Sequence, residues 1–147
     1  MIAPWREPVR DEWIDYNGHL SEAYYVLVLG HATDAVMEHV GLGPHYRSEQ
    51  SASLFTVEAH LRYLDQVSAG DELEVRSSVV GATAKLLWIW HELWVADRLC
   101  ATEEILGVHV DSQRGRSTPF PDDVLHRIAA VRVPPGPDAG RRIQLPD

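Results

Sequence analysis

The sequence predicts an α+β fold in which an antiparallel sheet curls around one long helix. Two observations support this prediction. The segment from Ser21 to Val40 has the pattern of a helix, and its first half, from Ala23 to Leu29, is apolar on nearly every side. An ordinary surface helix shows a single apolar stripe instead. The segments after this helix alternate apolar and polar residues with the period of two that is typical of strands.

The beginning of the chain predicts a strand, a polar turn and then the helix. Residues 9–15 are expected to form a short first strand, which delivers the turn Asp15-Tyr16-Asn17-Gly18-His19 at its end. Ser21 is the expected N-cap of the helix, Glu22 suits the positive end of the helix dipole, and Gly41 suits the helix C-terminus. Residues 41–51 carry Gly, Pro and charge and are predicted to form a loop.

Four strands in a meander are predicted to follow. The first is expected to present one face made of Phe55, Val57, Ala59, Leu61 and Tyr63. The second contains Leu73, Val75 and Val79, the third covers residues 87–95 and the fourth residues 99–111. A short amphipathic helix is expected over residues 122–131. We therefore divide the chain into one domain, residues 1–132, and a Pro- and Gly-rich tail, residues 133–147, that is mobile or extended.

Composition limits the partners and the compartment. The formal net charge of -9 leaves no basic surface for nucleic acid or for an anionic membrane. The single cysteine, Cys100, excludes an internal disulfide framework and suggests a reducing, cytoplasmic setting. No segment approaches the roughly 20 apolar residues of a membrane span, and the N-terminus lacks a signal peptide pattern.

The tryptophans of the third strand predict self-association. Trp88, Trp90 and Trp94 fall on one face of that strand, the face opposite Leu87 and Leu93. A single curled sheet leaves such a stripe and its own edges only partly covered. We therefore expect a homodimer or a dimer of dimers.

The polar turn carries a resemblance to a known family. Two stretches are similar to hot dog fold acyl thioesterases, namely Asp15-x-Asn17-x-His19-x-x-Glu22-x-x-Tyr25 and Val57-Glu58-x-His60-x-x-Tyr63-Leu64. The resemblance extends from about Val9 to Pro121. The string from Trp13 to His19, with Ala32-Thr33-Asp34-Ala35 and His109-Val110-Asp111, most resembles the betainyl-CoA thioesterases of carnitine breakdown. Ser21 and Glu22 depart from the pair of asparagines found in the carrier-protein enzymes.

The resemblance implies hydrolysis of a short acyl-CoA thioester to a free acid and CoA. Asp15 would act as base or nucleophile, Asn17 would orient water or the carbonyl, and His19 would donate a hydrogen bond or carry a proton to the thiolate. Glu22 lies beside this turn and is a further catalytic candidate. The unpaired amides at the start of the helix are the expected oxyanion site. CoA is part of the substrate, and neither a cofactor nor a metal is expected.

Substrate-binding candidates lie in four other places. Tyr25 closes the stretch that begins at Asp15. His60 lies with Glu58 and Arg62 on a strand face that is either a cleft wall or a solvated surface. Arg114 and Arg116 are the clustered basic pair for the coenzyme phosphates. The walls considered for an aromatic cage around a trimethylammonium group are Trp5, Trp13, Tyr24, Tyr25 and Trp88.

Other interpretations remain open at the level of sequence. The turn also has the composition of an ordinary capping turn before a helix. A hot dog enoyl-CoA hydratase would carry Asp-x-Asn-Pro-x-His, but Gly18 replaces the proline and His19 comes one position early. A non-catalytic acyl-CoA-binding module needs the same pocket. The histidines His19, His31 and His39 lack the i, i+4 spacing of helical zinc ligands.

Overall fold

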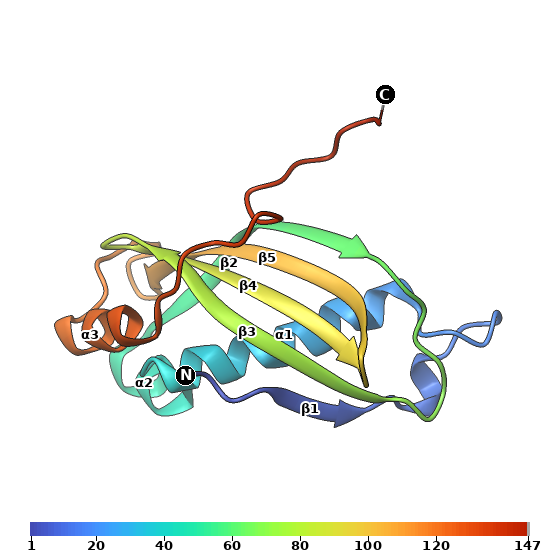
Figure 1. The fold of residues 1–147 in the computed structure, drawn as a ribbon. Helices are drawn as coiled ribbons and strands as arrows, with labels where there is room; N and C mark the ends of the chain where they lie inside the picture. The colour runs from blue at the N-terminus through green and yellow to red at the C-terminus, as the bar shows by residue number, and fades with distance from the viewer. Residues whose placement is uncertain (147) are drawn as a thin grey trace.

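The chain forms a curved antiparallel sheet with one long helix, α1 (Glu22–His39), lying across one face (Figure 1). A computed structural model describes residues 1–146. The strands are β1 (Trp5–Pro8), β2 (Ala52–Tyr63), β3 (Glu72–Ala82), β4 (Leu86–Val95), β5 (Arg98–Asp111) and β6 (Arg116–Ser117). Their order is β1-β3-β4-β5-β2, with β6 paired to β5, and every pairing is antiparallel. The predicted α+β class is confirmed, and β2 is an edge strand.

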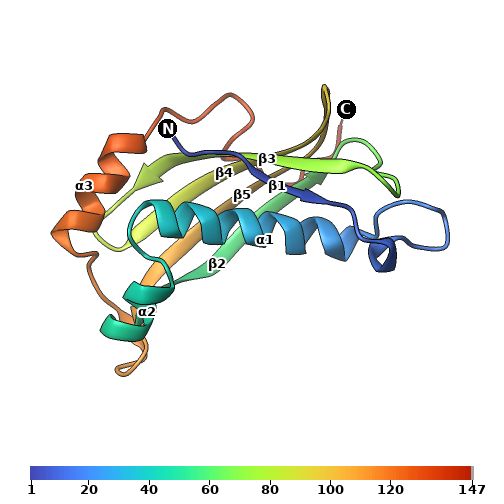
Figure 2. The same ribbon diagram turned by 90° about the horizontal axis from the view of Figure 1, so that it is seen from below.

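Two shorter helices close one end of the sheet. They are α2 (Pro44–Gln50) and α3 (Asp122–Val131), and both lie at the end of the sheet away from the polar turn (Figure 2). The predicted loop over residues 41–51 was wrong in part, because Pro44 stands at the first helical position, where its fixed φ favours a helix. Across residues 1–146, no helix is long and apolar enough to cross a membrane.

The predicted first strand was also wrong. β1 lies earlier, at Trp5–Pro8, and pairs with β3, whereas residues 11–13 form one 3-10 turn. Val9 and Trp13 are both buried, 7% and 5% exposed. Apolar residues four apart share one side of a strand as well as of a helix, so their spacing could not reveal the 3-10 turn.

The core lies between α1 and the concave face of the sheet, and it covers only one side of the helix. Val28, Leu29 and Val36 are fully buried, whereas Val26 and Leu27 remain 48% and 42% exposed. The composition of α1 predicted a helix wrapped by the sheet on all sides. The sheet covers only one side of it. One apolar face of α1 stays uncovered within the subunit.

A β-bulge changes which residues of β2 share a face. The pairing of β2 with β5 shifts between Thr56 and Glu58. As a result Leu54 and Thr56 lie on the helix side together with Ala59. The predicted single face that began with Phe55 was wrong, because a period of two cannot reveal the extra residue of a bulge. Phe55 and Val57 are 47% and 59% exposed on this edge strand.

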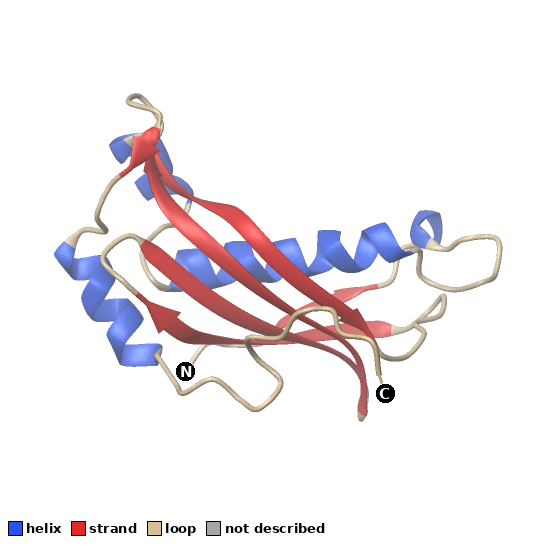
Figure 3. Cartoon of the chain, turned by 90° about the horizontal axis from the view of Figure 1, so that it is seen from above, coloured by secondary structure: helices blue, strands red, loops and turns tan. Residues whose placement is uncertain are grey.

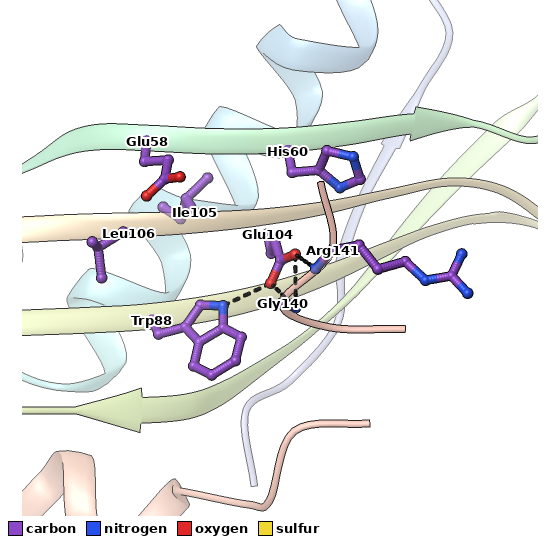
Figure 4. Close-up of a pocket in the computed structure, with 8 residues that line it drawn as sticks. All are labelled: Glu58, His60, Trp88, Glu104, Ile105, Leu106, Gly140 and Arg141. Carbon is purple, nitrogen blue, oxygen red and sulfur yellow. Dashed lines mark hydrogen bonds between the residues drawn. The ribbon is translucent and has the colours of Figure 1, made fainter. Parts of the chain in front are cut away.

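The convex face of the sheet is covered in part by the C-terminal segment, which crosses it as an extended arm (Figure 3). The arm leaves β3 where Val133 N–H donates to the Val79 carbonyl at 2.9 Å. Further along, the backbone amides of Gly140 and Arg141 donate to the Glu104 carboxylate at 2.8 to 3.1 Å. The indole of Trp88 donates to the same carboxylate at 2.9 Å (Figure 4). Trp90 and Trp94 donate to Glu92 at 3.2 and 3.0 Å, so the expected tryptophan stripe is half-buried and hydrogen-bonded.

Candidate active site

The polar turn is held by the side chain of Asp15. Its Oδ1 atom accepts the backbone N–H of Asn17 at 2.8 Å and that of His19 at 3.3 Å. The backbone N–H of Asp15 donates to the His19 carbonyl at 2.9 Å, and Gly18 adopts a φ of 80° that disfavours other residues. Among residues 1–146, no partner is found for Oδ2. One carboxylate oxygen of Asp15 thus builds the turn and the other is free for chemistry.

The turn leads directly into the exposed amino end of α1. Leu20 N–H donates to the Val67 carbonyl at 2.7 Å and Ser21 N–H to the Trp13 carbonyl at 3.0 Å, which fixes the direction of entry. Ser21 occupies the N-cap position as predicted, but within the described chain its side chain makes no capping hydrogen bond. The first amides of the helix, at Glu22 and Ala23, therefore keep their N–H groups available at the positive end of the dipole.

A cleft of about 600 Å³ opens at this point between the turn, α1 and the end of β2. Tyr63 donates its hydroxyl to the Glu22 carbonyl at 3.2 Å, and Tyr25 donates to the Asp65 carbonyl at 3.2 Å. The two rings meet edge to face, 5.0 Å apart. Burial raises the pKa of Tyr25 and of Tyr63, so both hydroxyls stay protonated at neutral pH. We call this the turn cleft.

The structure brings four predicted site residues together in the turn cleft. They are Asp15, His19, Glu22 and Tyr25. Asn17 belongs to the same turn but is exposed, and it does not line the cleft. Trp13 is buried beneath the turn, with its ring stacked on Tyr24 at 5.6 Å, so it supports the turn from the core.

The remaining predicted binding residues lie elsewhere in the subunit. His60 is on the convex face of the sheet, beside Glu104 and Arg141 and away from the helix (Figure 4). Arg114 and Arg116 follow β5 at the end of the sheet opposite Tyr63. The aromatic cage does not assemble within one subunit. Trp5 packs against His31 near β1, while Trp88 lies on the convex face.

A second cavity of about 490 Å³ runs along the uncovered face of α1, and we call it the helix groove. Its apolar walls come from α1, β2 and β5: Val26, Leu27, Met37, Leu54, Ala59 and Ile105. Gly30 and Asp34 line it from the helix. A Cβ atom added at Gly30 would meet nothing within 4 Å. The groove is open space beside an apolar helix face.

Glu103 is a groove residue that the sequence interpretation missed. It is 5% exposed, and within residues 1–146 its carboxylate has neither a hydrogen bond nor an ion pair. Burial raises the pKa of the Glu103 carboxyl to about 7. The signal was present, since Glu103 and Glu104 are adjacent in a strand and successive side chains point to opposite faces. One of the two acids had to face the helix.

His91 lies opposite Glu103 in the β4–β5 register. Its ring is fully buried and contacts the hydroxyls of Thr33 at 2.8 Å and Ser77 at 2.7 Å. Burial lowers the pKa of His91 to about 3, so the ring is neutral at physiological pH. It therefore provides no positive charge for Glu103.

Neither a metal cluster nor a reactive thiol is present in the described chain. No group of three His, Cys, Asp or Glu side chains within residues 1–146 could hold a metal ion. Cys100 is fully buried, as expected of a core residue, and burial raises the pKa of its thiol. A buried thiol with a raised pKa is a poor nucleophile.

Comparisons of the sequence agree on a family. Residues 9–128 match the family model of the thioesterase-like superfamily. A betainyl-CoA thioesterase from Pseudomonas aeruginosa is 41% identical over 154 aligned positions, covering 99% of this chain and 96% of that protein. An L-carnitine dehydrogenase/betainyl-CoA thioesterase from Agrobacterium fabrum is 38% identical over 82% of this chain, which corresponds to 25% of that longer protein.

Solved structures agree with this result. A Staphylococcus aureus protein in complex with CoA has a TM-score of 0.89 and 27% identity, covering 99% of this chain and 98% of that one. A putative thioesterase from Pseudomonas putida has a TM-score of 0.82 and 35% identity, covering 97% and 96%. A gentisyl-coenzyme A thioesterase, 17% identical with a TM-score of 0.76 over 86% and 98%, supports the fold alone. The predicted fold and activity are confirmed: the chain belongs to the thioesterase-like superfamily and is an acyl-CoA thioesterase with the hot dog fold.

Proposed function

We propose that this enzyme hydrolyses betainyl-CoA to betaine and CoA at the turn cleft. The observation that carries the proposal is the free carboxylate oxygen of Asp15 beside the unpaired first amides of α1. A thioester needs a base or nucleophile next to donors that stabilise an oxyanion, and this turn supplies both. The 41% identical betainyl-CoA thioesterase supports the choice of acyl group.

The reaction uses few protein groups. The thioester carbonyl oxygen accepts hydrogen bonds from the amides of Glu22 and Ala23, where the helix dipole favours the developing negative charge. Asp15 either removes a proton from the attacking water or attacks the carbonyl carbon itself, in which case water then cleaves the resulting anhydride. The C–S bond breaks in both routes, and a His19 N–H donates a hydrogen bond to the departing thiolate, which leaves as the anion. Asn17 holds the turn through its backbone amide.

We also propose a homodimer formed by pairing β2 with its copy. β2 is an edge strand, and its apolar residues Phe55 and Val57 are exposed. Such an edge is open to pairing with another strand. Antiparallel two-fold pairing brings the beginning of one β2 to the end of the other. The partner's Arg114 and Arg116 would then approach the turn cleft, where the coenzyme phosphates need positive charge.

The dimer is tested by the sedimentation coefficient of Val57→Lys. A lysine at this edge position should shift the native dimer towards monomer, because it places a charge in an apolar interface. Ile143→Lys is the matched control, since Ile143 is 90% exposed and lies on the C-terminal arm. A native protein that sediments as a monomer, or a dimeric Val57→Lys, would contradict the proposed interface.

The proposal includes no cofactor beyond the coenzyme that arrives with the substrate. CoA thiolate is a good leaving group, so neither a Lewis acid nor strong general acid assistance is required. The single buried cysteine is compatible with the reducing, cytoplasmic location that we propose.

The function is tested by free thiol release from a panel of acyl-CoA esters. We expect betainyl-CoA to give the highest kcat/KM, with slower release from acetyl-CoA, butyryl-CoA and a long-chain acyl-CoA. If thiol is released rapidly only from other acyl-CoA esters, one of those esters, and not betainyl-CoA, is the substrate. No release from any ester would refute assignment of the reaction to the turn cleft.

A further inference from the structure

The helix groove continues the turn cleft along one face of α1. Glu22 lines the turn cleft, and Val26, Gly30 and Asp34 line the helix groove. These residues are spaced by four, so they lie above one another on the same side of the helix. The Glu103 carboxylate is near enough to Tyr63 of the turn cleft for its charge to raise the pKa of that hydroxyl. The path from the turn cleft along this side of α1 therefore leads towards the wall of the helix groove that carries Glu103.

Glu103 is a largely buried carboxyl group that the described chain leaves without a counter-charge, and its oxygens are open to the groove rather than sealed in the core. Among the residues of the groove, His31 is the one basic side chain, and its Nδ1 atom lies 2.6 Å from Glu7 Oε2. His91, opposite Glu103, is neutral. A buried carboxylate without a partner destabilises a fold, so it is uncommon unless a ligand or a reaction uses it. The charge that would relieve it is a cation.

We propose that Glu103 is a specificity residue that selects an acyl group bearing a quaternary ammonium. This inference rests on the proposed function, because it places the thioester carbonyl at the amino end of α1. It names the side chain that distinguishes a cationic acyl group from a neutral one of the same shape. Glu103 acts by charge at the acyl group and takes no proton from the reacting water.

The chemistry of the groove suits this ligand. A quaternary ammonium has no N–H to donate, so it is recognised by charge and by contacts with its methyl groups. Val26, Leu27 and Ile105 supply apolar surface for the methyl groups, and Glu103 supplies the charge. Within the described chain no aromatic side chain lines this groove, so the charge is supplied by Glu103, and the aromatic rings of Tyr25 and Tyr63 lie in the turn cleft. In a betainyl group a single methylene separates the carbonyl from the nitrogen, which keeps the cation next to the turn cleft.

The test compares two substrates that differ only in charge. They are betainyl-CoA and tert-butylacetyl-CoA, in which carbon replaces the quaternary nitrogen. Glu103→Gln should lower kcat/KM for betainyl-CoA by about 10- to 100-fold, as expected for loss of one charge interaction in a partly buried site. It should leave kcat/KM for tert-butylacetyl-CoA within about threefold of the native value. Glu104→Gln, on the opposite face of the same strand, is the control and should not change the ratio of the two substrates.

The possible outcomes separate this inference from the proposed function. Equal loss on both substrates would overturn the inference, because it would indicate a role in the chemical step or in packing. An unchanged substrate ratio would also overturn it while leaving betainyl-CoA hydrolysis intact. A native enzyme that fails to hydrolyse betainyl-CoA would overturn the proposed function itself. If circular dichroism shows that Glu103→Gln is misfolded, Glu103→Asp is the deciding variant. It keeps the charge and should keep the preference for betainyl-CoA. Loss of that preference would refute the inference.

Discussion

Replacing Asp15 by asparagine separates catalysis from the structural role of this side chain. In the native turn Oδ1 accepts two backbone amides, at 2.8 and 3.3 Å, while Oδ2 is the oxygen left for chemistry. The amide oxygen of asparagine can accept the same two hydrogen bonds. It is, however, neither a base nor a nucleophile at neutral pH. The variant therefore keeps the turn and loses the reactive group.

The two effects have different magnitudes. Loss of a positioned general base typically lowers kcat by about 10²- to 10⁴-fold, or about 3 to 5 kcal/mol of transition-state stabilisation. The stability change should be small, because two charge-assisted hydrogen bonds become neutral ones, at a cost of about 1 kcal/mol. For a domain of this size that corresponds to a Tm about 3 °C lower. Asp15→Ala loses both hydrogen bonds and should be less stable than Asp15→Asn by about 1 to 2 kcal/mol.

The assay measures thiol release from betainyl-CoA beside thermal unfolding of the native protein and both variants. We expect Asp15→Asn to be nearly inactive with a Tm close to native, and Asp15→Ala to be inactive with a clearly lower Tm. An Asp15→Asn that hydrolyses betainyl-CoA within about tenfold of the native rate would refute the assigned role. Asp15 would then be only the capping residue of an ordinary turn before a helix.

Three further predictions concern other parts of the subunit. Gly30→Ala should raise the free energy of unfolding by about 0.5 to 1 kcal/mol in a denaturant titration, because alanine is the better helix former and its Cβ meets no atom within 4 Å; a loss of stability would indicate that a partner subunit packs there. Burial raises the pKa of Glu103 to about 7, so the folded protein loses stability as the pH rises from 4.5 to 7. Burial lowers the pKa of His91 to about 3, so the folded protein loses stability as the pH falls below 6.5. In the native protein these two effects oppose each other between pH 6.5 and 4.5, so its free energy of unfolding changes little there. Glu103→Gln keeps only the His91 effect and should lose about 1.4 kcal/mol of unfolding free energy per pH unit as the pH falls over this range. Equal slopes for the two proteins would contradict the pKa directions. Glu104→Gln weakens the carboxylate that anchors the C-terminal arm, so trypsin should cleave after Arg141 faster than in the native protein, and an unchanged cleavage rate would show that other contacts hold the arm.

The sequence was most informative where one pattern determined one structure. The alternation of β3, β4 and β5 predicted these strands correctly, because burial of one face dictates a period of two. The apolar run of α1 predicted the helix, but not that one of its apolar faces stays exposed. The bulge at Val57 and the helix α2 were missed. Both depend on local backbone geometry that leaves little trace in hydropathy. The C-terminal arm was predicted only as mobile or extended, because its contacts with Glu104 use backbone amides rather than side chains.

The candidate site shows the same division. The turn from Asp15 to His19 was evident because its polar residues are contiguous, and the structure places three of the predicted catalytic side chains around one cleft. His60, Arg114 and Arg116 were chosen by residue type, but their distance from the turn depends on the face of β2 and on the length of β5. Within one subunit they lie away from the turn cleft, and only the proposed two-fold axis brings the arginines towards it.

The two acids of β5 are buried to a similar degree, 5% and 7% exposed, so it is the presence or absence of hydrogen-bond partners that singles out the proposed specificity residue. Glu103 and Glu104 are adjacent and chemically identical, yet Glu104 accepts hydrogen bonds from two backbone amides and an indole N–H, whereas Glu103 has no partner within residues 1–146. The satisfied acid anchors the arm and needs no ligand. The unsatisfied acid reduces the stability of the free protein, and binding a cation would reverse that cost. A cationic substrate is therefore bound more tightly than a neutral one of the same shape by a side chain that makes no contact with the coenzyme.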